Sequence, residues 1–141
     1  MSAAAAAVTA VAFVWLGMVV AISFVEAPLK FQAPGVTVLI GLGIGRLVFR
    51  ALNTAEAIFA MTIVPVLAAG SLPVRVVVPL AAAVAVLAAQ LLLVRPRLSR
   101  RSSAVLAGQD APRSHAHYAY VGLEAVKAAA LLAGGVLLLA I

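Results

Sequence analysis

The chain contains no cysteine, which excludes disulfide bonds, zinc-thiolate sites and thiol redox chemistry. Charged residues are also scarce: they make up 10% of the 141 residues, against 66% hydrophobic residues. A soluble domain has about 25% charged residues, and the mean hydropathy here is +1.23. The composition therefore predicts an integral membrane protein in contact with the lipid bilayer.

The few charges are mostly basic, with a formal net charge of +6. Such a balance also occurs in proteins that bind nucleic acid, but here the basic residues mostly flank apolar stretches. That placement fits contact with anionic lipid headgroups. We therefore expect no nucleic-acid partner.

Four apolar stretches of about 20 residues predict an all-α, four-helix transmembrane bundle that forms a single domain over residues 1–141. We place the spans at residues 3–25, 51–69, 74–94 and 118–141. Arg46 and Arg50 interrupt the apolar run before the second span. Residues 36–49 are therefore expected to form a short interfacial helix or a helical extension of that span. Residues 95–117 are expected to form a basic cytoplasmic loop.

The basic residues also predict the orientation. Eight of the ten lysines and arginines lie in or beside the first and third loops, which share one side of a four-span protein. These loops should face the cytoplasm, and both termini should be extracytoplasmic. We expect the membrane to be a bacterial cytoplasmic membrane.

The fourth span carries a polar face. His117, Tyr120, Glu124 and Lys127 are spaced by 3, 4 and 3 residues, which places them within roughly 80° of arc on a helix. An ionisable residue within a membrane costs about 2.5–3.5 kcal/mol on insertion scales and usually marks function. A structural ion pair, of Glu124 with Lys127 or of either with Glu56 or Arg46, is the alternative interpretation.

Further polar residues lie in the first two spans. Arg46, Asn53 and Glu56 follow one another into the second span, and Glu26 ends the first. With the predicted orientation, all of them fall in the cytoplasmic half of the membrane. We therefore expect a pocket that is open to the cytoplasm and closed on the outer side by apolar packing. Interhelical hydrogen bonds explain Asn53 and Glu56 equally well, and snorkelling explains Glu26.

Two motifs are reminiscent of metal or nucleotide sites but are not expected to form them. His115 and His117 cannot share a helix face two residues apart and could converge only if His115 lay in the loop. No metal site and no cofactor is therefore predicted. Gly41, Gly43 and Gly45 resemble a phosphate-binding loop but lack the strand–turn–helix context, and we expect close helix packing there. The small residues throughout also allow a homo-oligomer, such as a homodimer.

These features favour a small transporter or binding protein for an ion or small polar molecule. Its site would comprise Glu124, Lys127, Glu56, Asn53 and Arg46, and Glu124 or His117 would exchange protons. A second hypothesis is a membrane enzyme that acts on a lipophilic substrate from the inner leaflet, although no catalytic motif identifies its catalytic residues. A third is an accessory subunit of a larger membrane complex.

The layout also resembles a family of small four-span membrane proteins. The residues that carry the resemblance are 17–25 followed by Leu29 and Phe31, the Arg-Pro-Arg run at 95–97, and His115 or His117 at the start of the last span. The family includes eukaryotic TMEM-type proteins associated with cisplatin resistance, and bacterial relatives. The resemblance implies a membrane protein linked to efflux or resistance. This chain differs in having Glu124 and Lys127 where the family tends to have small polar residues.

Overall fold

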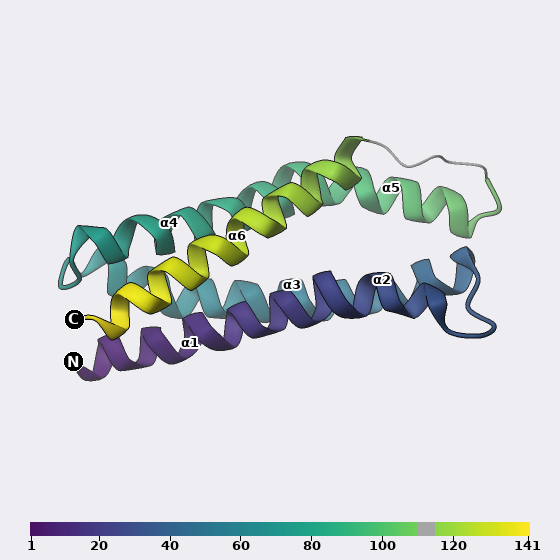
Figure 1. Ribbon diagram of the computed structural model, residues 1–141. Helices are drawn as coiled ribbons and strands as arrows, with labels where there is room; N and C mark the ends of the chain where they lie inside the picture. Colours follow the sequence, from purple (N-terminus) through teal and green to yellow (C-terminus); the bar gives the residue numbers. More distant parts are fainter. Residues whose placement is uncertain (110–114) are drawn as a thin grey trace.

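A computed structural model describes residues 1–109 and 115–141 of the chain. Four long helices run side by side as a bundle (Figure 1). Each is long and apolar enough to cross a membrane, and together they cover residues 3–32, 38–68, 74–106 and 116–139. The predicted all-α membrane bundle is confirmed. Both termini lie at one end (Figure 1), which we call the terminal end. The opposite end, which includes Lys30, Arg46 and Arg101, is the basic end.

The first long helix is built from several segments. It comprises α1 (Ala3–Val19), the π-helical η1 (Val20–Glu26), α2 (Ala27–Leu29) and the 3-10 turn η2 (Lys30–Gln32). The Ser2 side chain caps α1 by accepting a hydrogen bond from the backbone N–H of Ala5 at 3.0 Å, as a helix N-terminus requires. Chain reversal follows at Gly35, whose φ of 81° suits glycine.

The second long helix, α3 (Val38–Ala68), is continuous. It begins at Thr37, whose side chain accepts a hydrogen bond from the backbone N–H of Ile40 at 3.2 Å. It then passes Arg46 and Arg50 without a break. Of the two structures expected for residues 36–49, the helical extension is therefore the one formed.

The third long helix extends well beyond its predicted end. It consists of α4 (Val74–Ala89), the π-helical η3 (Gln90–Val94) and α5 (Arg95–Leu106). We expected a loop from residue 95, and this was wrong for residues 95–106. Pro96 lies in the first turn of α5, where proline is tolerated, and the arginines that follow favour helix. Residues 110–114, with Arg113, lie outside the described part of the chain.

The fourth long helix, α6 (His115–Leu139), packs against α1 and α4, and α3 packs against the same two neighbours. Consequently α3 and α6 lie on a diagonal of the bundle. In the terminal half the centre is apolar, with fully buried Val8, Ala12, Leu80 and Leu131. This packing closes the bundle at the terminal end, as the sequence predicted for one side of the membrane.

The glycine-rich motif packs closely, as predicted. A β-carbon at Gly41 would overlap the ring of Phe31, and one at Gly45 would contact the Lys30 ammonium group at 3.0 Å. A β-carbon at Gly43 would meet nothing within 4 Å. Gly41 and Gly45, one turn apart on α3, thus leave room for the two side chains of η2. This contact positions Lys30 beside the interior of the bundle.

Candidate functional site

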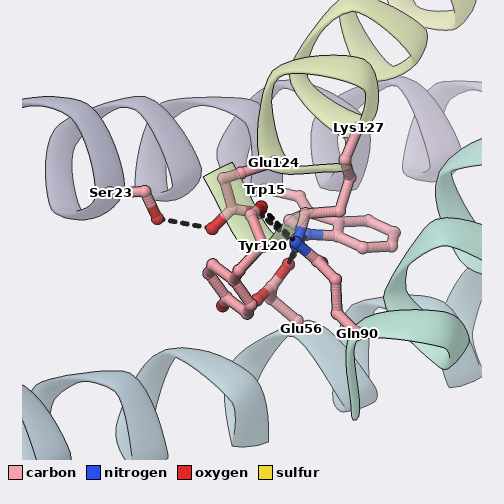
Figure 2. Close-up of polar contacts among 7 residues, drawn as sticks. All are labelled: Trp15, Ser23, Glu56, Gln90, Tyr120, Glu124 and Lys127. Carbon is pink, nitrogen blue, oxygen red and sulfur yellow. Dashed lines mark hydrogen bonds and ion pairs between the residues drawn. The ribbon is translucent and has the colours of Figure 1, made fainter. Parts of the chain in front are cut away.

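Lys127 is the centre of a buried polar cluster. Its ammonium group contacts a carboxylate oxygen of Glu56, lies 2.6 Å from Glu124 Oε1, and donates a hydrogen bond to Gln90 Oε1 at 2.7 Å (Figure 2). Lys127 and Glu56 are fully buried, and Glu124 is 1% exposed. We call Glu56, Glu124 and Lys127 the charged triad.

Three polar side chains complete the cluster. The indole N–H of Trp15 donates to Glu56 Oε2 at 2.8 Å, and the hydroxyl of Ser23 donates to Glu124 Oε2 at 2.5 Å. The amide of Gln90 donates to Glu124 Oε1 at 3.3 Å. Each of the four long helices thus contributes to the cluster, as Figure 2 shows.

The two π-helical segments place part of this cluster. Ser23 lies in η1 and Gln90 in η3. Residues five apart on a regular α-helix are roughly 140° apart around the axis, whereas a π turn, closed by an i→i+5 hydrogen bond, brings them closer together. The backbone N–H of Arg95 donates to the carbonyl of Gln90 in this way. Gln90 therefore reaches the triad while Arg95 also faces the interior.

Burial makes the triad energetically demanding. Each buried ion costs several kcal/mol of desolvation, which only close partners can offset. Lys127 has three such partners, and both oxygens of Glu124 accept hydrogen bonds or an ion pair. Glu56 Oε1, by contrast, is buried without a hydrogen-bond partner among the described residues.

A cavity of about 900 Å³ extends from the basic end to the triad. Ser99, Arg101 and Ser102 line it at that end, and Ser23, Asn53, Tyr120 and Glu124 line it in the interior. Glu124 therefore belongs both to the cavity wall and to the triad. Beyond the triad, the apolar packing of the terminal half closes the path.

The cavity wall is strongly basic. The cationic side chains that line it are Lys30, Arg46, Arg50, Arg95 and Arg101, with His117 beside them. Among the described residues, Glu124 is the one carboxylate in the wall, and it is already paired with Lys127. The cavity should therefore attract anions and repel cations.

Aromatic rings hold two of these cations in place. The Lys30 ammonium lies 5.8 Å, and the Arg95 guanidinium 5.3 Å, from the centre of the Phe49 ring. Arg95 also lies 5.9 Å from the centre of the Tyr120 ring. Such cation–π contacts orient a cation without neutralising its charge. The charge of Arg95 therefore stays available to a ligand, whereas Lys30 is also paired with Glu26.

The structure brings together most of the predicted site residues. Glu124, Lys127 and Glu56 form the triad. Four further predicted residues line the cavity: Arg46, Asn53, His117 and Tyr120. Glu26 is not in the cavity wall; it forms an ion pair with Lys30 at 3.7 Å.

Seven residues of the cluster and the basic wall were not among the predicted site residues: Trp15, Ser23, Lys30, Arg50, Gln90, Arg95 and Arg101. Trp15 and Gln90 are isolated hydrogen-bonding residues in apolar runs, and this isolation could have identified them as site residues. Ser23 and Arg95 carry no such signal, because the π-helical segments determine the direction in which they point.

Within the described residues, no group of three or more His, Cys, Asp or Glu side chains is arranged to hold a metal ion. The side chain of His115 lies outside the described part of the chain. Comparisons with protein-family models, curated proteins and solved structures find no match to this chain. The resemblance to the four-span family stays a prediction, and the site is interpreted from its own geometry.

Proposed function

We propose that this membrane protein binds a small organic anion in the cavity and carries it across the membrane, with the basic end facing the cytoplasm. The observation that carries the proposal is the charge of the cavity wall: five lysine and arginine side chains against one carboxylate. That carboxylate, Glu124, is already paired with Lys127. An anion would therefore meet a wall that carries more positive than negative charge.

The arginines suit carboxylate or phosphate groups. A guanidinium group donates parallel hydrogen bonds to two oxygens of such an anion. Arg46 and Arg50 come from α3, and Arg95 comes from the facing α5. An anion between these helices would be contacted from both sides, in surroundings where water screens charge less than in bulk solution.

The cavity also accommodates an apolar group. Phe24, Phe31 and Phe49 line it together with aliphatic side chains. Its volume of about 900 Å³ falls within the range of about 300–1,000 Å³ typical of small-molecule sites. An inorganic ion would leave most of this space unfilled, so an organic anion with an apolar portion suits the cavity better.

The closed terminal half supports a carrier rather than an ion channel. An ion channel lines its whole path with polar groups, whereas here Val8, Leu80 and Leu131 fill the path beyond the triad. A cavity that is open at one end and closed at the other corresponds to one state of an alternating-access carrier.

Binding by purified protein in detergent tests the proposal. Calorimetry with benzoate, inorganic phosphate and choline should give tightest binding for benzoate and none for choline. Arg46→Gln should weaken benzoate binding about tenfold, which is about 1.4 kcal/mol. Arg75→Gln, at an exposed position at the terminal end, is the matched control and should bind as the wild type does.

Two results would overturn the proposal. Choline binding as tight as benzoate binding would remove its basis, as would equal benzoate affinity in Arg46→Gln and wild type. Uptake of labelled benzoate into sealed proteoliposomes then tests carriage: binding without any uptake would reject the carrier and leave a binding protein.

A further inference from the structure

The two carboxyl groups of the triad differ in their hydrogen-bond partners. Glu124 accepts from donors at both oxygens: from Lys127 and Gln90 at Oε1, and from Ser23 at Oε2. A carboxylate with both oxygens accepting is the ionised form. Glu124 therefore supplies the negative charge that balances Lys127.

Glu56 differs from Glu124 at one oxygen. Its Oε2 accepts from Trp15 and contacts Lys127, whereas its Oε1 is buried without a hydrogen-bond partner among the described residues. Asn53 lies three residues earlier on α3, on the same helix face, and its Oδ1 is also buried without a partner. Two buried acceptors with no donor between them are costly.

One proton resolves both problems. If both carboxyl groups were ionised, two negative charges would share the ammonium group of Lys127, and the triad would hold a net charge of −1. A proton on Glu56 Oε1 makes the triad neutral. It also creates an O–H donor on the same helix face as the unpartnered Asn53 Oδ1.

We propose that Glu56 holds a proton on Oε1 and that the loading of this proton favours binding of the anion in the cavity. The second part rests on the proposed function; the first part does not. The groups that face the triad come from every neighbouring segment: Trp15, Ser23, Asn53, Gln90, Arg95 and Tyr120.

The cavity comes within one helical turn of this proton: Glu56 is buried behind the wall, and Asn53, three residues earlier on α3, lines it. Asn53 and Tyr120 line the cavity floor next to the triad. When Glu56 loses its proton, the floor becomes more negative and repels an incoming anion. An anion should therefore bind more weakly as the pH rises and Glu56 loses its proton, and in that pH range anion binding should draw a proton from solution.

Infrared spectroscopy of the ligand-free protein tests the first part. The wild type at neutral pH should show the carbonyl band of a protonated carboxyl group. Glu56→Gln should remove this band, and Glu26→Gln, the matched control outside the triad, should retain it. A spectrum without the band, or a band that survives Glu56→Gln, would overturn the assignment.

Asn53→Ala keeps the test informative should Glu56→Gln fail to fold. Loss of the amide acceptor should shift the band to higher frequency, and an unchanged frequency would contradict a hydrogen bond donated by Glu56 to Asn53. The spectra are also recorded with sodium replaced by choline. A binding site that requires sodium and shows no carboxyl band would mean that a sodium ion occupies the position we assign to the proton.

The pH dependence of benzoate affinity tests the second part. For coupling to one proton, affinity in the wild type should fall by up to about tenfold per pH unit as the pH rises through the range in which Glu56 loses its proton. In Glu56→Gln the affinity should be independent of pH across that range. Wild-type affinity that does not change with pH would overturn the coupling and leave anion binding standing. Absence of benzoate binding at every pH would instead refute the proposed function and, with it, this coupling, while the infrared test of the first part stands on its own.

Discussion

The ammonium group of Lys127 on α6 contacts the carboxyl group of Glu56 on α3 across the diagonal of the bundle. The same ammonium group lies 2.6 Å from Glu124, one turn earlier on α6. One side chain thus joins two helices whose main packing partners are α1 and α4. The stability of this junction and the chemistry of the cavity floor depend on the same three residues.

Removal of the lysine should be the most damaging single change in the triad. Lys127→Met leaves two buried carboxyl groups without a cation, and loss of one partner from a buried ion pair costs about 3–5 kcal/mol. Glu56→Gln should cost clearly less, because the remaining pair of Glu124 and Lys127 is balanced. Denaturant unfolding in detergent measures both variants. The double variant should be less destabilised than the sum of the two single ones; strict additivity would contradict the shared contact.

The glycines of the second long helix should differ sharply in their response to alanine. Gly41→Ala places a β-carbon against the ring of Phe31, whereas Gly43→Ala places one in open space. Overpacking of this kind costs about 1–3 kcal/mol. Thermal unfolding should therefore show a lower midpoint for Gly41→Ala and little change for Gly43→Ala. Equal midpoints would mean that Phe31 does not pack against α3.

Two arginines of α5 should distinguish the effect of a charge in the cavity wall from that of a charge on the surface. Arg95 lines the cavity and lies over Phe49, whereas Arg97 is exposed and outside the cavity wall. Arg95→Gln should weaken benzoate binding about tenfold, or about 1.4 kcal/mol, and Arg97→Gln should leave it unchanged. Titration calorimetry measures both, and similar losses in both variants would indicate a general effect of charge at the basic end.

The fluorescence of Trp15 should report the state of the triad. Trp15 is the one tryptophan of the chain, and its indole N–H donates to Glu56 Oε2 at 2.8 Å. A hydrogen bond to a charged acceptor is stronger than one to a neutral acceptor, so the emission should change as Glu56 loses its proton with rising pH. Glu56→Gln should abolish this pH dependence. An identical response in the variant would assign it to another group.

Periodicity predicted part of the site, because the relevant residues share one helix. The spacing of Tyr120, Glu124 and Lys127 places them on one face of α6 whatever the other helices do. Glu26 was predicted from its position at the end of the first span, but it does not line the cavity and pairs with Lys30 instead. The loop predicted from Arg95 was wrong because a basic composition indicates exposure to water but does not indicate a loop.

The sequence by itself determined the membrane class, the four spans, the concentration of polar groups in one half of the bundle and the polar face of the last helix. These follow from local composition and helical spacing, which need no knowledge of neighbouring helices. Only the tertiary structure decided that Lys127 joins Glu56 to Glu124, that Trp15, Ser23 and Gln90 complete the cluster, and that Arg95 faces the cavity. Contacts between helices depend on the rotation of each helix about its axis. In the first and third long helices a π-helical segment changes that rotation, and the spacing of residues in the sequence does not reveal this change.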